Sequence, residues 1–341
     1  MSASAHLVGD LPIIDIGPLV DPSATAPDVA AVGRQIDAAC RDIGFFGIVG
    51  HGVNPRLQGR LERASHEFFR LTEDEKADIA MIHAGRAWRG WFPVGGELTS
   101  GRPDRKEGIY FGAEQPPDHT RVRAGAALHG ANLYPAYPPD LGPLVTTWLA
   151  EMQRVAEAVM GGIALALGLP RDWFAEHLTA DPTVLFRIFH YPPNDQREES
   201  ESADEWGVAE HTDYGLLTVL AQDDLGGLEV ARRGGGWISV DPVPGMFVCN
   251  LGDMLERLTN GRYRSTPHRV RNRSTKGRLS FPYFFDPSWD ATVPVLPIAD
   301  EARSADRPRW DGADVTAWEG RYGDYLTAKV AKVFPELFIQ T

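Results

Sequence analysis

The second half of the chain consists of short β-type runs separated by Gly, Pro and Asp, and this pattern constrains the fold more than any other feature. The runs cover 184–191, 216–222, 228–230, 246–250 and 279–285. Several short strands at this spacing, with no helix between them, are typical of an antiparallel barrel or sandwich and not of a parallel sheet. A chain of 341 residues is long enough to surround such a core with helices.

Helical patterns lie before and after this β region. Apolar residues at helical spacing predict four helices, at 27–42, 55–71, 142–167 and 315–334. Thr72 and Glu75 have capping-box spacing, which predicts a further short helix. Two strands are expected at 11–16 and 45–49, and residues 85–112, rich in Gly, Trp, Phe and Arg without a clear period, are expected to be irregular. The sequence shows no internal repeat and no linker, so we expect one domain over residues 1–341.

The charge of the chain argues against polyanionic partners. Asp and Glu outnumber Lys and Arg by 47 to 34, which gives a formal net charge of −13. We therefore expect neither nucleic acid nor an anionic membrane as a partner. No apolar stretch approaches the roughly 18 residues of a membrane span, and the N-terminus has no signal pattern. Cys40 and Cys249 lie in apolar surroundings and require no oxidising compartment, so we expect a cytoplasmic protein that acts on a small molecule.

The most informative motif is His211-Thr212-Asp213. Residues two apart on an extended chain project to the same side, so His211 and Asp213 can reach one metal ion. His268 can supply a third ligand from another strand. Two imidazoles and one carboxylate on one face leave neighbouring coordination positions open, and this ligand set most suggests non-haem Fe(II) oxygen chemistry.

Arg278 and Ser280 form a second pair with the same spacing. A planar guanidinium group matches the two oxygens of a carboxylate, and a hydroxyl can add a further hydrogen bond. A metal triad beside such a clamp indicates a site for a chelating acid.

Together with several other segments, these motifs resemble the isopenicillin N synthase-like family of Fe(II)- and 2-oxoglutarate-dependent oxygenases. The resemblance covers essentially the whole chain and includes residues 12–15, 44–46, 51–53, 191–193, 211–213, 250–253, 259–261, 268–270 and 278–280. It implies a mainly β fold with flanking helices and a distorted double-stranded β-helix (jelly-roll, cupin-like) core. The catalytic core would span 180–290, after an N-terminal family region over 1–120.

The resemblance also implies roles for individual residues. His211, Asp213 and His268 would bind Fe(II), Arg278 and Ser280 would hold the far carboxylate of 2-oxoglutarate, and Tyr191 would hydrogen-bond this co-substrate. The implied reaction uses O2 and releases succinate and CO2 while a small-molecule metabolite is oxidised. Hydroxylation or desaturation of a natural product or amino-acid-like compound is the expected outcome.

Substrate contacts are expected on two segments. Arg187 and Phe189 alternate with Tyr191 along one strand and should line the same face. Family analogy places aromatic N-terminal segments over the mouth of the pocket. This predicts four further substrate contacts, at Trp88, Arg89, Phe92 and Tyr110.

Three alternative functions are compatible with the sequence. The first is a same-fold Fe(II) oxidase independent of 2-oxoglutarate, because the chain ends in Gln340-Thr341 as isopenicillin N synthase does. The second is an ethylene-forming type, because residues 211–217 and 221–224 are similar to the bacterial ethylene-forming enzyme. The third is a non-catalytic barrel that binds a small acid. Succinate release, O2 uptake without 2-oxoglutarate and binding without turnover distinguish these cases.

Overall fold

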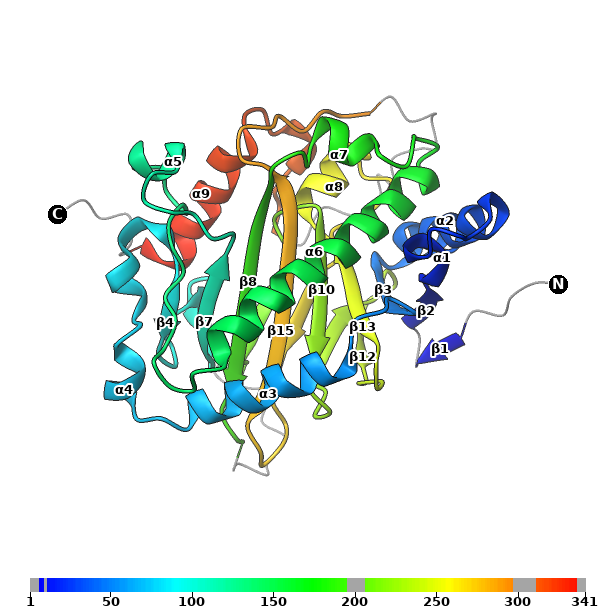
Figure 1. Ribbon diagram of the computed structural model, residues 1–341. Helices are drawn as coiled ribbons and strands as arrows, with labels where there is room; N and C mark the ends of the chain where they lie inside the picture. The colour runs from blue at the N-terminus through cyan, green and yellow to red at the C-terminus, as the bar shows by residue number, and fades with distance from the viewer. Residues whose placement is uncertain (1–5, 9–10, 195–205, 297–310, 336–341) are drawn as a thin grey trace.

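The computed structural model describes residues 6–8, 11–194, 206–296 and 311–335, and two β-sheets form its centre (Figure 1). The major sheet has nine strands in the order β1-β2-β3-β13-β10-β15-β8-β7-β4. Their bounds are β1 (His6–Val8), β2 (Leu11–Asp15), β3 (Phe45–Val49), β4 (Gly90–Phe92), β7 (Glu107–Gly112), β8 (Pro182–Tyr191), β10 (Leu217–Gln222), β13 (Phe247–Leu251) and β15 (Arg278–Ser288).

The minor sheet has the order β12-β11-β14-β9. It is made of β9 (Val208–His211), β11 (Leu228–Ala231), β12 (Trp237–Val240) and β14 (His268–Val270). A separate two-stranded hairpin pairs β5 (Leu98–Thr99) with β6 (Arg102–Pro103). Apart from the parallel pair β2–β3, the described strand pairs are antiparallel. The expected mainly β core with flanking helices is confirmed.

Helices cover the outer face of the major sheet. α6 (Leu141–Ala166) crosses this face against β10 and β15, and it also packs against α2 (Ala26–Asp42) and α3 (Pro55–Phe69). Gly162 lets α2 pack closely, because a Cβ atom there would lie 2.6 Å from Cδ1 of Ile36 and would force that side chain to move. The remaining helices are α1 (Gly17–Val20), α4 (Glu73–Ala77), α5 (Thr120–Arg123), α7 (Trp173–His177), α8 (Asp253–Leu258) and α9 (Tyr322–Val333), with 3-10 turns at Met81–Ala87 and Val315–Ala317.

Helix starts follow the local capping chemistry. The side chain of Thr25 accepts a hydrogen bond from the backbone N–H of Asp28 at the start of α2, and Asn54 does the same for Arg56 in α3. The predicted capping box of Thr72 and Glu75 is present at α4. These contacts satisfy backbone donors that a helix leaves unpaired at its N-terminus.

The expectation of irregular structure over 85–112 is wrong. This segment contains β4, β5, β6 and β7, and β7 pairs along its length with β8. All six residues of β7 are buried, so the strand lacks the alternation of polar and apolar residues that marks a half-exposed strand. The predicted helix at 315–334 begins only at Tyr322, because the chain at Gly320 has a positive φ of 135°.

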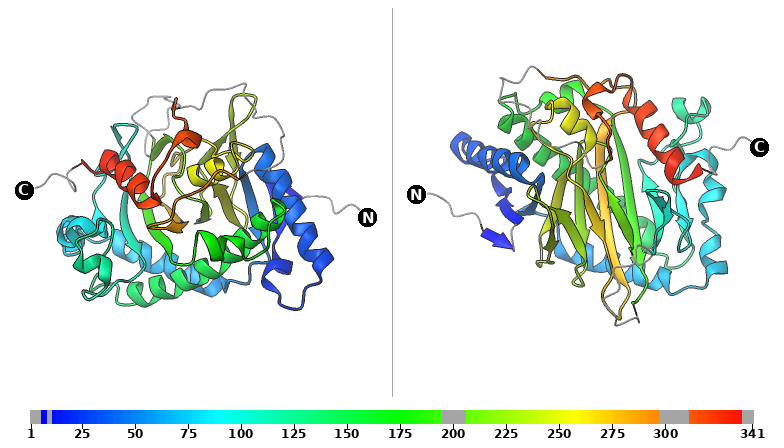
Figure 2. Two further views of the ribbon diagram at one scale, coloured as in Figure 1. Left: turned by 90° about the horizontal axis from the view of Figure 1, so that it is seen from above. Right: turned by 180° about the vertical axis from the view of Figure 1, so that it is seen from behind.

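The minor sheet and α9 lie on the side of the major sheet opposite α3 and α6 (Figure 2). Residues of both sheets line one cavity of about 510 Å³. In the described part of the chain, no helix is long and apolar enough to cross a membrane. Gln340 lies outside the described residues.

Candidate metal and co-substrate site

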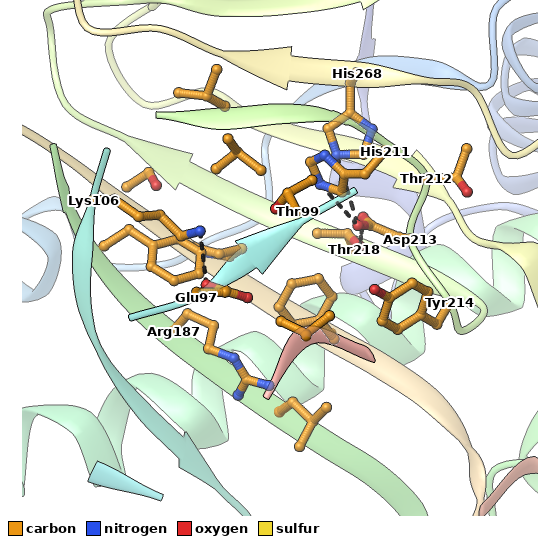
Figure 3. A pocket seen from close by; sticks show the side chains of 18 of the residues that line it. Glu97, Thr99, Lys106, Arg187, His211, Thr212, Asp213, Tyr214, Thr218 and His268 are labelled. Atoms are coloured by element: carbon orange, nitrogen blue, oxygen red, sulfur yellow. Dashed lines mark hydrogen bonds and ion pairs between the residues drawn. The ribbon is translucent and has the colours of Figure 1, made fainter. Parts of the chain in front are cut away.

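Three of the predicted residues meet at one end of this cavity (Figure 3). His211 ends β9 and His268 begins β14, and the two residues face each other as a pair across these strands. Asp213 follows β9, and its Oδ1 lies 3.9 Å from Nε2 of His211 and 3.7 Å from Nε2 of His268. The three potential ligand atoms lie within 4.8 Å of one another, which is close enough for one metal ion to bind all of them.

Backbone and side-chain hydrogen bonds orient these ligands. Nδ1 of His211 donates to the carbonyl oxygen of Ala209 (2.9 Å), and Nδ1 of His268 donates to that of Thr266 (3.2 Å). A histidine that donates through Nδ1 keeps its Nε2 lone pair for a metal. The Nε2 lone pairs of both histidines are therefore available to coordinate a metal ion.

The two oxygens of Asp213 are not equivalent. Oδ2 accepts hydrogen bonds from the hydroxyl of Thr218 and from Nδ2 of Asn250, the latter at 2.6 Å. Among the described residues, Oδ1 accepts no hydrogen bond and faces the two imidazoles. The arrangement leaves Oδ1 available as a ligand.

The ionisation of the site suits a cation. Burial and the neighbouring His211 lower the pKa of His268 to about 4, so His268 is neutral at neutral pH. Although burial alone would raise the pKa of Asp213, the two imidazoles and the hydrogen bonds from Thr218 and Asn250 lower it. Two imidazoles and one carboxylate are the ligand set from which the sequence predicts an Fe(II) site.

The predicted clamp lies on the major sheet. Arg278 and Ser280 are on β15, and Tyr191 on β8 is paired with Arg278. Arg278 is fully buried, and its Nε donates to the carbonyl oxygen of Gly226 while its Nη2 donates to Oε1 of Gln222 (3.3 Å).

Nη1 of Arg278 is buried and has no hydrogen-bond partner among the described residues. The Tyr191 hydroxyl and Oγ of Ser280 lie 3.2 Å apart, and both residues line the same cavity as the triad. A buried guanidinium with an unused donor is costly unless an acceptor meets it. The donor set therefore fits a carboxylate of 2-oxoglutarate.

The residues predicted to contact substrate fall into two groups. Trp88, Tyr110, Arg187 and Phe189 line the cavity. Arg89 does not, because its guanidinium turns away and donates to the carbonyl oxygens of 87, 88 and 128.

Phe92 also lies outside the lining and belongs to an aromatic layer behind it. Its ring contacts those of Tyr110, Phe189 and Phe334. The structure thus does not bring Arg89 or Phe92 to the cavity. Only some side chains of this segment line the cavity, and the others pack behind the lining residues.

The sequence motifs did not reveal a charged cluster of Glu97, Asp104 and Lys106. Glu97 and Lys106 of this cluster line the cavity. Lys106 lies between Glu97 and Asp104, and its Nζ is 2.7 Å from Oε2 of Glu97. Although burial alone would lower the pKa of Lys106, the two carboxylates raise it. Lys106 is only 1% exposed, a burial that nothing in the local sequence indicates.

Family comparisons agree with this geometry. Residues 182–287 match the family model of the 2OG-Fe(II) oxygenase superfamily. Residues 11–137 match the model described as non-haem dioxygenase in morphine synthesis N-terminal. The chain belongs to the 2OG-Fe(II) oxygenase superfamily. The predicted resemblance to its isopenicillin N synthase-like members is confirmed, and the protein is a 2-oxoglutarate-dependent non-haem iron dioxygenase.

Relatives of this oxygenase extend over nearly its full length. A probable iron/ascorbate oxidoreductase of Dictyostelium discoideum is 43% identical over 97% of this chain and 96% of its own. A 1-aminocyclopropane-1-carboxylate oxidase of Dictyostelium mucoroides is 34% identical, with 96% and 95% covered. A homoarginine-6-hydroxylase of Glycine max is 37% identical, with 96% and 98% covered.

A solved structure has the same fold. A Neurospora crassa protein, crystallised in complex with alpha-KG and thymine, superposes with a TM-score of 0.79 at 24% sequence identity. The match covers 96% of this chain and 99% of the Neurospora protein.

Proposed function

We propose that this oxygenase binds Fe(II) through His211, Asp213 and His268, and binds 2-oxoglutarate through Arg278, Ser280 and Tyr191. The proposal rests above all on one observation: buried Arg278, whose Nη1 has no partner among the described residues, lines the same cavity as the His-Asp-His triad. When bound, Fe(II) with 2-oxoglutarate and O2 supplies an oxidant for the substrate and yields succinate and CO2.

The protein's own residues orient these groups and exclude water from them. Thr218 and Asn250 hold one oxygen of Asp213, and Gln222 holds Arg278 in the direction of the cavity. The clamp residues Arg278, Ser280 and Tyr191 are each at most 3% exposed. A charge-assisted hydrogen bond in such a dry site is stronger than one in water, so these residues give both affinity and orientation to a dicarboxylic acid.

We propose that the substrate is a small organic acid in the remaining part of the cavity. Arg187 supplies a positive charge there, and Trp88, Tyr110 and Phe284 supply aromatic surface around it. The names of two relatives, the homoarginine-6-hydroxylase and the 1-aminocyclopropane-1-carboxylate oxidase, specify substrates that are carboxylic acids. These names support a small carboxylic acid as the substrate.

The test is an anaerobic titration of the metal-free protein with Fe(II) and then with 2-oxoglutarate, followed by visible absorption. We expect a new charge-transfer band only when both are present. Tight Fe(II) binding without such a band would reject the use of 2-oxoglutarate and favour a same-fold oxidase that does not need it.

Two variants assign the residues. Asp213→Ala should remove Fe(II)-dependent succinate formation, because only one oxygen donor is available among the three ligand residues. Arg278→Ala should raise the 2-oxoglutarate concentration needed for half-maximal band intensity by about 100-fold, the effect of losing a buried charged hydrogen-bond donor. Near-normal succinate formation in the first variant, or an unchanged requirement in the second, would refute the corresponding role.

A further inference from the structure

Arg187 is a buried cation with no direct ion pair among the described residues, although the more distant carboxylates of Glu97 and Asp286 favour its charged form. Its side chain comes from β8 and is 3% exposed. Its Nη1 donates to the carbonyl oxygens of Phe111 and Phe186, both at 3.3 Å. Its guanidinium carbon lies 3.6 Å from the ring centre of Tyr110 and 4.3 Å from that of Trp88. These contacts hold the guanidinium plane in place but leave its charge for a ligand.

A cluster of opposite charge reaches the same cavity through Glu97 and Lys106. The cluster of Lys106, Glu97 and Asp104 contains two carboxylates and one ammonium group, so it has one negative charge in excess. Asp104 is occupied by Lys106 and by the hydroxyl of Thr99. Glu97 is the member of the cluster with more exposed surface, because its side chain is 12% exposed and that of Asp104 is 2% exposed. Of the two carboxylates in the cluster, only that of Glu97 therefore lines the cavity.

Arg187 and Glu97 belong to one subsite. In Figure 3, Glu97 lies between Lys106 and Arg187, on the side of the cavity away from the two metal-binding histidines. Both charges act on the hydroxyl group of Tyr110. Burial and the charge of Glu97 raise its pKa, and Arg187 opposes this shift. Glu97 and Arg187 are nevertheless not an ion pair, since no oxygen–nitrogen contact within 4.0 Å joins them among the described residues.

Two other basic residues that line the cavity, Lys329 and Lys332, have less need of an anionic ligand. Lys329 lies 3.5 Å from Oδ2 of Asp253 and over the ring of Tyr214. Lys332 is exposed, so water already solvates its charge. Arg187 is therefore the buried cation of the wall that gains most from an anionic ligand.

We propose that Arg187 and Glu97 bind the two ends of a zwitterion, and that the substrate is a free α-amino acid. Its carboxylate would meet the guanidinium of Arg187 and its ammonium group would meet the carboxylate of Glu97. This inference rests on the proposed function, because it concerns the substrate of the same cavity. A cavity of about 510 Å³ is within the usual range for a small ligand.

Other substrate classes match this subsite less well. A simple carboxylic acid would pair with Arg187 but would bring no positive group to Glu97, which shares Lys106 with Asp104. A neutral heterocycle would neutralise neither residue. Sites built to hydrogen-bond a polar group discriminate strongly against ligands that lack the group, so blocking either end of the amino acid should be decisive.

The first experiment compares free and blocked amino acids. The Fe(II)-loaded full-length protein with 2-oxoglutarate is assayed for succinate formation with the proteinogenic L-amino acids, L-homoarginine and 1-aminocyclopropane-1-carboxylate. Each compound that responds is repeated as its N-acetyl derivative and as its carboxamide. We expect at least one free amino acid to accelerate succinate formation by about tenfold or more, and both blocked forms to lose most of this effect.

The second experiment measures binding without turnover. Anaerobically, the responding amino acid should perturb the visible band of the Fe(II)–2-oxoglutarate complex. Glu97→Gln should raise the dissociation constant of the free amino acid by about 10- to 100-fold while leaving that of its N-acetyl derivative unchanged. Arg187→Lys keeps the charge but loses the planar guanidinium group. It should raise the dissociation constant of the free amino acid and leave that of its carboxamide unchanged.

Two surface variants are matched controls. Glu151→Gln on α6 and Arg321→Lys before α9 make the same chemical changes outside the cavity and should leave both dissociation constants unchanged. The 2-oxoglutarate band itself shows that each cavity variant is folded and loaded. Its retention in Glu97→Gln and Arg187→Lys separates a lost substrate contact from a damaged site.

The possible results separate the two proposals. Blocked amino acids that act as well as free ones would overturn the zwitterion subsite, and so would equal weakening of free and blocked ligands by Glu97→Gln. A normal 2-oxoglutarate band with no response to any amino acid would also overturn it, while the proposed function would stand. The absence of the band would instead overturn the proposed function, and this inference with it.

Discussion

At the scale of single residues, each key polar side chain of the site uses some of its atoms for hydrogen bonds within the protein and leaves another atom available to a ligand. Asp213 accepts hydrogen bonds from Thr218 and Asn250 through Oδ2, and its Oδ1 is the proposed metal ligand. Arg278 donates to internal acceptors through Nε and Nη2, and its unpaired Nη1 is the donor proposed for the co-substrate. A side chain held at one end presents its other end in a fixed direction, so the ligand does not have to order it.

Thr218 tests this division at the metal. Thr218→Val keeps the shape of the side chain but removes the hydroxyl that donates to Asp213, so we expect the Fe(II) dissociation constant to rise by about tenfold. The measurement is an anaerobic Fe(II) titration. Thr147→Val is a matched control, because that exposed hydroxyl on α6 bonds only the carbonyl oxygen of Pro143. An unchanged Fe(II) affinity in Thr218→Val would show that Asn250 alone orients the carboxylate.

At the scale of elements, the clamp depends on the end of β10 and the turn that follows it. Gln222 closes β10, and its Oε1 accepts from Nη2 of Arg278, while Gly226 in the turn accepts from Nε. Gln222→Leu removes one of these acceptors at similar size. We expect the 2-oxoglutarate dissociation constant to rise by about 3- to 10-fold, the usual effect of one hydrogen bond. Because Gln222 does not touch the triad, the Fe(II) affinity of the same variant is the internal control. Equal 2-oxoglutarate affinity in wild type and variant would contradict the positioning role.

Sequence patterns predict helices and strands well where a single local signal, such as an apolar run or a helix cap, determines the element. The apolar runs of β3, β8, β10 and β13 and the capped helices α2, α3 and α4 are present, and the three ligand residues meet as expected. β7 was missed because it is buried throughout and contains Glu107, whose charge suggests surface. In the structure Lys76, Trp91 and His190 satisfy that carboxylate. Glu97 and Gln222 were missed because their roles arise only from contacts between segments distant in sequence.

At the scale of the whole molecule, α9 connects the metal site with the substrate wall. Its Tyr322 and Tyr325 hydroxyls donate to two buried carboxylates, Asp286 of β15 and Asp253 of α8. Asp253 also donates its backbone N–H to the carbonyl oxygen of Asp213 (2.8 Å). On its inner side, α9 contributes Leu326 and other residues to the cavity. Hydrogen bonds thus connect α9, through Asp253, to the segment that carries the proposed metal ligand Asp213. The position of α9 and the shape of the cavity are therefore linked.

The pH dependence of stability tests this connection through Asp286. Burial raises the pKa of Asp286 to about 7, against an ordinary value of 3.8. The folded protein therefore retains this proton more tightly than the unfolded chain, and the resulting stability is complete below about pH 4 and is lost as the pH rises to about 7. Asp286→Asn cannot titrate, so the unfolding free energy of wild type should fall relative to that of the variant across this interval, by at most roughly 1.4 kcal/mol per pH unit. Urea denaturation of the metal-free proteins at several pH values measures this difference, with exposed Asp324→Asn as the control. A difference between wild type and Asp286→Asn that stays constant with pH would mean that Asp286 is already ionised where Tyr322 of α9 binds it.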